Sequence, residues 1–223
     1  EKIGYGFGDM SSSMFWKIFS AYLPIFYATV FHLSLEVTGV LMLVTRIWDA
    51  VSDPMMGIIA DRTNTRWGKY RPYLLWMSIP FAIAGVLLFT KPEFGEPGNT
   101  VWAFFTYILM MTVYTGINVP YGSMLGVMTE DSDEKTVFSS FRMFFAYAGS
   151  FIVLAMWEPL CNFFANMIGT LKDGETLTRD PQAWQYAMMV IGVTCFALFV
   201  LTFLMTRENV KTVEKTTSVK DDL

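Results

Sequence analysis

Long apolar segments alternate with short polar ones along the whole chain. Each apolar segment reaches the roughly 20 residues that a helix needs to cross a bilayer. Backbone inside lipid must form its own hydrogen bonds, which favours helices, and a β-barrel would show shorter runs of alternating residues. We therefore predict six transmembrane helices, over residues 4–31, 37–60, 73–90, 101–127, 138–168 and 184–205.

The composition agrees with this pattern. Of the 223 residues, 53% are hydrophobic and only 16% are charged, against about 25% charged residues in a typical soluble domain. The first apolar segment is too long for a signal peptide and lacks a cleavage site of small residues, so we expect it to be retained. The predicted fold class is an all-α polytopic membrane protein.

The basic residues in the loops predict the orientation of the chain. With the N-terminus inside, the loops assigned to the cytoplasm carry ten Lys and Arg residues and the exterior loops carry three. Positive charge is enriched in cytoplasmic loops, so we expect both ends of the chain in the cytoplasm and a location in the bacterial inner membrane. The exterior residues are Lys91, Lys172 and Arg179.

The residue types that most enzymes and metal proteins use are scarce. Cys161 and Cys195 both lie in apolar runs, and His32 is the single histidine, which gives little support to a zinc or haem site. The chain has no phosphate-binding loop and no hydrolase or metalloprotease motif. We predict that it is not an enzyme, that it needs no cofactor, and that nucleic acid is not a partner.

The second apolar segment contains three charges where a membrane helix normally has none. Each charge at a helix centre costs about 2.5–3.5 kcal/mol on insertion scales. Asp49 and Asp53 are four residues apart and share a helix face with Arg46. Arg46 neutralises one carboxylate, and the other is left for a mobile Na⁺ or H⁺, with the Ser52 hydroxyl nearby. The alternative is a set of structural ion pairs between helices.

The first segment carries a polar stripe. Asp9, Ser12, Ser13 and Trp16 are spaced so that they share one helix face. A carboxylate, hydroxyls and an aromatic ring suit the binding of a sugar, although Trp16 as a packing residue with serines at a helix contact is the alternative. Lys17 is added to the candidate sugar site, and its partner is either Asp9 or an aspartate of the second segment.

Four motifs carry a resemblance to a known family. They are "GYGFGDMSSSMFWK", "TRIWDAVSDPMMGIIADRTNTRWGKYRPY", "YTGINVPYGSML" and "SSFRMFFAYAG", in this order. The chain resembles the glycoside–pentoside–hexuronide:cation symporters, the melibiose-permease branch of the major facilitator superfamily. This resemblance implies twelve helices in two halves of six, with this chain as the N-terminal half, two inverted three-helix repeats, and residues 206–223 as the start of the central cytoplasmic loop.

The resemblance also implies roles for particular residues. The implied cation ligands are Asp49, Asp53, Ser52 and Thr115. The implied sugar contacts are Asp9 and Arg142, and Asn118 stands where melibiose permeases have a second sugar-binding aspartate. Gly122 stands where those permeases have a tryptophan that stacks on the sugar. These two departures predict a substrate other than a galactoside.

The loop after the second segment is a candidate gate. It begins with Asp61 and continues with Arg62, Arg66 and Lys69. In the superfamily that the chain resembles, this loop carries charges that close the cytoplasmic side in the outward-open state. Plain enrichment of positive charge on the cytoplasmic side is the alternative explanation, and the two are compatible.

The expected function is symport of a sugar or glycoside with Na⁺ or H⁺. Membrane lipid and the C-terminal six-helix half of the same transporter are the other expected partners. A sugar sensor on the same scaffold that does not transport is the main alternative. An intramembrane aspartyl protease is less suitable, because its carboxylates must face each other from different helices, whereas Asp49 and Asp53 share one.

Overall fold

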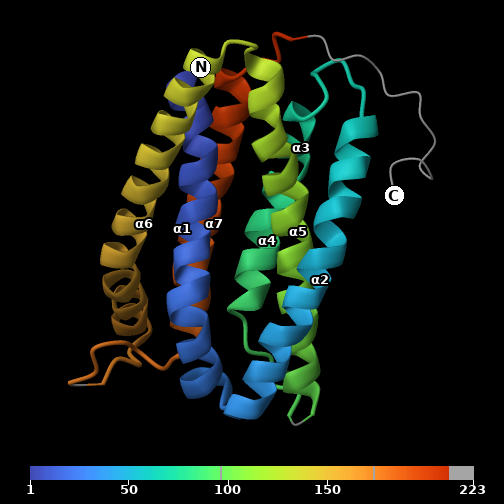
Figure 1. The fold of residues 1–223 in the computed structure, drawn as a ribbon. Coiled ribbons are helices and arrows are strands. Elements are labelled where there is room, and N and C mark those ends of the chain that lie inside the picture. Colours follow the sequence, from blue (N-terminus) through green and yellow to red (C-terminus); the bar gives the residue numbers. More distant parts are fainter. Residues whose placement is uncertain (96, 173, 211–223) are drawn as a thin grey trace.

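A computed structural model describes residues 1–95, 97–172 and 174–210, and its helices form one bundle (Figure 1). The described chain crosses this bundle six times. The crossings are α1 (Lys2–Phe26) with its π-helical extension η1 (Tyr27–Phe31), α2 (Leu35–Arg62), α3 and α4 together (Arg71–Trp76 and Ser78–Leu88), α5 (Gly98–Met128), α6 (Ser132–Ile168) and α7 (Pro181–Met205). Residues 211–223 of the predicted cytoplasmic loop lie outside the described residues.

Local side chains account for several helix starts. The Ser34 hydroxyl accepts a hydrogen bond from the Val37 backbone N–H at 3.3 Å, at the start of α2. Asp131 and Asp180 accept the N–H groups two residues further on, at the starts of α6 and α7. Such caps satisfy N–H groups that lack a partner within the helix. The boundaries therefore follow from the polar residues between the apolar segments.

Five of the six crossings are long and apolar enough to span a membrane. They are Lys2–Phe31, Arg71–Leu88, Gly98–Met128, Ser132–Ile168 and Pro181–Met205. Helix α2 falls short on composition, because Arg46, Asp49 and Asp53 lie in its middle. Its 28 residues extend over about 42 Å at 1.5 Å per residue, which is ample for a crossing. The deficit of α2 is therefore one of charge and not of length.

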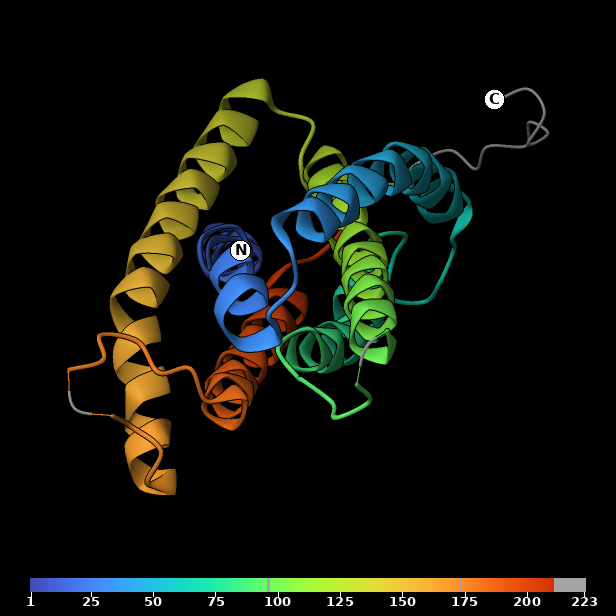
Figure 2. The same ribbon diagram turned by 90° about the horizontal axis from the view of Figure 1, so that it is seen from below.

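The helix contacts repeat in a regular way. Helix α1 packs on α6, α2 packs on α5, and α4 packs on α7, while α1 also contacts α7 and α4 also contacts α5. Exchanging the first three crossings with the last three replaces α1 by α5, α2 by α6 and α4 by α7, and the reverse. Under this exchange the α1–α6 contact becomes the α5–α2 contact, and the α1–α7 contact becomes the α5–α4 contact. Figure 2 shows α1 between α6 and α7 on one side and α5 between α2 and α4 on the other. This pairing is what two inverted three-helix repeats produce.

An aromatic cluster fills the end of the bundle opposite the N-terminus. Phe26, Phe89, Trp157 and Trp184 are fully buried or nearly so. The Phe89 and Trp184 rings stack with centroids 6.0 Å apart, and Trp157 meets Trp184 edge-on at 5.7 Å. These rings come from α1, α6, α7 and the residue after α4, so the cluster ties four crossings together. In contrast, the outer face of α6 is apolar and exposed, as at Phe151.

Helices α1 and α6 approach closely at a glycine. A Cβ atom added at Gly149 would lie 2.8 Å from Met10 Cγ and 2.9 Å from the Met10 carbonyl oxygen. The second of these contacts is with backbone, which has little freedom to move. Small residues allow this kind of approach between membrane helices. Gly149 therefore sets the spacing of the helices that carry Asp9 and Arg142.

Replacing Gly149 by alanine is expected to destabilise the bundle. Overpacking of this kind costs about 1–3 kcal/mol, so the apparent midpoint of thermal unfolding in detergent should fall by several degrees. Gly57→Ala is the matched control, because a Cβ there would have no atom within 4 Å and should slightly favour the α2 helix. Equal midpoints for the two variants would contradict this packing argument.

Candidate functional site

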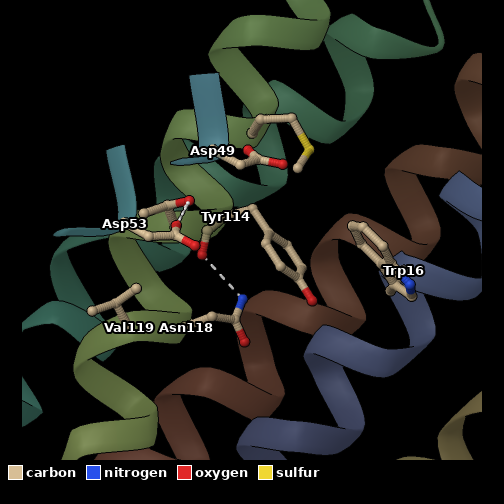
Figure 3. A pocket seen from close by; sticks show the side chains of 8 residues that line it. Trp16, Asp49, Asp53, Tyr114, Asn118 and Val119 are labelled. Atoms are coloured by element: carbon tan, nitrogen blue, oxygen red, sulfur yellow. Dashed lines mark hydrogen bonds between the residues drawn. The ribbon is translucent and has the colours of Figure 1, made fainter. Parts of the chain in front are cut away.

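A pocket of about 230 Å³ lies between α1, α2 and α5 (Figure 3). The residues that line it come from these three helices and include two carboxylates, two aromatic rings, a hydroxyl and an amide. They are Trp16, Asp49, Asp53, Met111, Tyr114, Thr115, Asn118 and Val119. Pockets for drug-sized molecules usually measure about 300–1,000 Å³. The space is therefore smaller than a typical pocket for a drug-sized molecule.

The two carboxylates of α2 have different partners. Thr115 of α5 donates its hydroxyl to Asp53 Oδ1 at 2.8 Å. Asp49 Oδ2 lies 4.0 Å from Arg46 Nη1, and the Arg46 side chain is 70% exposed. An ion pair so long and so exposed is worth little. Arg46 is thus near Asp49, as the spacing predicts, but it neutralises that charge only weakly.

One oxygen of this pair has no donor within the described part of the chain. Asp49 Oδ1 is buried and accepts no hydrogen bond there. A buried polar atom without a partner costs free energy, and such atoms often mark a site for an ion or water. Oxygen ligands suit hard cations, and two carboxylates one helical turn apart also favour binding of a proton. The chemistry of the pocket fits either Na⁺ or H⁺.

Ser52 does not join this pocket, although its spacing suggested that it would. Its hydroxyl lies 3.5 Å from the Asp49 carbonyl oxygen in the same helix. It is absent from the residues that line the pocket between α1, α2 and α5. Serine hydroxyls often bond back to the preceding helical turn, and this local bond competes with a role in the site.

Two aromatic rings form the wall opposite the carboxylates. The rings of Trp16 and Tyr114 lie 5.3 Å apart between centroids, and the Trp16 ring stacks on Phe19 at the same distance. The Arg46 guanidinium lies 5.9 Å from the Trp16 ring centroid. Trp16 therefore packs against other rings on one face and also borders the pocket. Figure 3 shows Trp16 and Tyr114 across the pocket from Asp49 and Asp53.

Asn118 lies on the wall formed by α5. Its side-chain amide donates to the Tyr114 carbonyl oxygen at 3.0 Å, which directs the amide group along its own helix. Tyr114 and Met111 were not singled out from the sequence, and both line the pocket. Their spacing from Asn118 places them on or beside one face of α5, so the helical period could have identified them.

Asp9 and Arg142 meet at a separate point, between α1 and α6. Arg142 Nε lies 3.2 Å from Asp9 Oδ2, and the two side chains are 34% and 19% exposed. Neither lines the pocket of Asp49 and Asp53. The partner of Asp9 in this structure is therefore Arg142 and not Lys17. Lys17 is exposed.

The loop between α2 and α3 brings opposite charges together. Lys69 Nζ lies 3.4 Å from Asp61 Oδ1, and the Tyr70 hydroxyl donates to the same oxygen at 2.6 Å. Burial, with the Asp61 carboxylate beside it, raises the pKa of Tyr70 above its ordinary value. The Arg66 guanidinium stacks on the Trp67 ring at 4.7 Å. Of the candidate gate residues, Asp61 and Lys69 thus form a pair, and Arg66 takes another position.

Comparison with known proteins gives consistent results. A family profile described as "MFS/sugar transport protein" matches residues 4–222. The chain is 42% identical over 209 residues to a protein named putative glycoside/cation symporter YagG of Escherichia coli, which covers 93% of this chain and 43% of that protein. It is 38% identical to the uncharacterized symporter YnaJ of Bacillus subtilis over 94% of this chain and 43% of that protein. It is 35% identical to the isoprimeverose transporter of Lactiplantibacillus pentosus over 98% of this chain and 44% of that protein.

These matches agree with the fold and with the pocket. The chain spans less than half the length of these curated relatives. Its six crossings are consistent with half of a twelve-helix transporter fold, and its apolar helices are those of a multi-pass membrane protein. The chain belongs to the MFS/sugar transport family of the major facilitator superfamily, alongside proteins named as glycoside–cation symporters.

Proposed function

We propose that the chain is the N-terminal half of a secondary transporter that couples uptake of a sugar or glycoside to Na⁺ or H⁺. The observation that carries this proposal is the pocket between α1, α2 and α5. There the Asp49 and Asp53 carboxylates lie across from Trp16 and beside Asn118. Asp49 Oδ1 lacks a hydrogen-bond donor among the described residues. A candidate ion site and a candidate sugar-stacking surface therefore border the same space.

The coupling follows from this shared space. An ion bound between the two carboxylates and the Thr115 hydroxyl cancels negative charge on one wall of the pocket. It also holds α2 against α5, the helix that presents Tyr114 and Asn118. A sugar that uses those side chains then binds a site that the ion has ordered. By linkage, the sugar raises the affinity for the ion by the same factor.

The orientation of the chain is part of the proposal. The start of α1 and the ends of α2, α5 and α7 lie at one end of the bundle (Figure 1). Arg62 ends α2 at this end and Arg66 and Lys69 follow it, whereas Lys91 follows α4 at the other. Excess positive charge favours the cytoplasmic side, which supports cytoplasmic termini in a bacterial inner membrane. The C-terminal half would then face α1, α2, α5 and α6 and close the cavity.

Transport by the full-length protein in sealed vesicles tests this function. Uptake of a labelled neutral glycoside should depend on an imposed inward gradient of Na⁺ or H⁺. Counterflow, in which preloaded unlabelled sugar drives entry of labelled sugar, should occur without any gradient. A sensor on the same scaffold would bind sugar but show neither uptake nor counterflow, and that result would contradict the proposal.

Asn118 is expected to set part of the sugar preference. In Asn118→Asp the side chain loses its hydrogen bond to the Tyr114 carbonyl oxygen and places a third carboxylate in the pocket. Relative affinities across a panel of neutral glycosides should change by about tenfold, since a hydrogen bond to a charged group contributes about 1.5–3 kcal/mol. Competition binding measures this, and Asn99→Asp, near the start of the same helix, is the control. An unchanged order of affinities would remove Asn118 from the specificity residues.

A further inference from the structure

A single carboxylate holds the start of α3. Glu208, three residues after the end of α7, accepts hydrogen bonds from three consecutive backbone N–H groups. Glu208 Oε2 accepts from Lys69 at 2.8 Å, and Oε1 accepts from Tyr70 at 2.7 Å and from Arg71 at 2.9 Å. Charged acceptors form stronger hydrogen bonds than neutral ones. These bonds join the α2–α3 loop to a segment much later in the chain, since Tyr70 and Glu208 are 138 residues apart in sequence.

The backbone of the loop is shaped to receive this carboxylate. Gly68 has a φ of +114°, and a Cβ added there would lie 2.5 Å from Glu208 Cδ. Residues other than glycine rarely adopt this conformation. Glycine at position 68 thus permits the positive φ of the turn and also leaves room for the Glu208 carboxylate to approach the backbone.

Further contacts fix the same segment to its surroundings. Arg71 Nη2 donates to the Phe203 carbonyl oxygen near the end of α7 at 2.6 Å, and its guanidinium lies 4.7 Å from the Phe203 ring centroid. The backbone N–H groups of Asn209 and Val210 both donate to the Val127 carbonyl oxygen near the end of α5. The segment 206–210 therefore connects the ends of α5 and α7 with the start of α3.

Two of the three amides that donate to Glu208 belong to residues whose side chains contact Asp61. Lys69 pairs with Asp61 through its ammonium group, and Tyr70 donates its hydroxyl to the same carboxylate. Their backbone is tied to Glu208 at 2.8 and 2.7 Å. A shift of this backbone would therefore move Lys69 and Tyr70 together relative to Asp61.

We propose that Glu208 is a positioning residue that places Lys69 and Tyr70 against Asp61 and so stabilises closure of the cytoplasmic side. The closure itself rests on the proposed transport function, whereas the placement of the loop does not. Without Glu208 the three amides lose their acceptor, the loop moves away from α7, and the Asp61 pair loosens. The cytoplasmic side then opens more often.

Hydrogen–deuterium exchange of the full-length protein in detergent tests the placement. In E208Q the side chain keeps one acceptor oxygen and loses the charge, so the amides of residues 69–71 should exchange at least about tenfold faster. E134Q is the control, because Glu134 is a partly exposed carboxylate whose contacts are with Lys2 at 3.7 Å and with the Thr129 hydroxyl, and exchange at 69–71 in this variant should match wild type. Unchanged exchange in E208Q would overturn the proposal.

A cysteine at position 122 tests the effect on closure without any sugar. Gly122 of α5 is exposed and has open space around an added Cβ, and Cys161 and Cys195 are buried. In full-length G122C freed of other accessible cysteines, E208Q should make labelling by an impermeant maleimide from the cytoplasmic side several-fold faster, and E134Q should not. Faster exchange with unchanged labelling would refute the role in closure.

The two measurements stay separate from the test of transport. Neither requires a substrate, so a failure of sugar uptake would count against the proposed function and leave these results valid. If E208Q does not fold, E208D replaces it in both assays. This variant keeps the charge but withdraws the carboxylate by one methylene group, and smaller changes in the same directions are expected.

Discussion

Replacing Asp53 or Asp49 by asparagine is expected to abolish the stimulation of sugar binding by the coupling ion. Asp53 accepts the Thr115 hydroxyl at 2.8 Å, and Asp49 has a buried oxygen with no donor among the described residues. An amide in place of either carboxylate removes half of the negative charge that retains the ion. Coupling between sites commonly amounts to about 5–150-fold in affinity, and this whole factor should disappear while some sugar binding remains.

Isothermal titration of sugar into the full-length protein measures this effect, with and without Na⁺ and across a range of pH. Asp133→Asn is a suitable control, since this aspartate lies in the exposed first turn of α6, away from the pocket. Thr115→Val keeps the shape of the side chain and removes the hydroxyl, so the affinity for the ion should fall by about tenfold. Unchanged ion dependence in both aspartate variants would mean that the carboxylates serve only in structural pairs.

The second large effect is expected at the pair of Asp9 and Arg142. If Asp9 accepts hydrogen bonds from sugar hydroxyls, Asp9→Asn should lower sugar affinity by about 10- to 100-fold, because a charged acceptor becomes a neutral amide. The same variant also removes the carboxylate that pairs with Arg142, whose side chain is only 34% exposed. The thermal stability of the variant should therefore fall as well.

A double variant separates these two consequences. Asp9→Asn combined with Arg142→Gln removes both charges, so stability should recover towards wild type while sugar affinity stays low. Lys2→Gln is the control, because the ion pair of Lys2 with Glu134 is long, at 3.7 Å, and partly exposed to solvent, and such pairs contribute little. Recovery of sugar affinity together with stability would show that the Asp9–Arg142 pair only supports the fold.

Much of the fold could be predicted because its signals are local. The apolar segments mark the membrane crossings, since each stretch of helix in lipid must satisfy its own backbone and present apolar side chains. Asp49 and Asp53 share a face because the helical period places residues four apart one above the other. Ser52, by contrast, does not line the pocket, and its hydroxyl lies 3.5 Å from the carbonyl oxygen of Asp49 in the preceding turn of its own helix.

The sequence by itself determined that charges lie inside α2 and that they need compensating partners, because burial of charge in lipid is costly. Only the tertiary structure decided which groups complete each site. Thr115 reaches Asp53 across 62 residues of sequence, Arg142 and not Lys17 pairs with Asp9, and Glu208 meets the amides of the α2–α3 loop. These partners lie on different helices, and their meeting depends on how the helices pack, which no local period specifies.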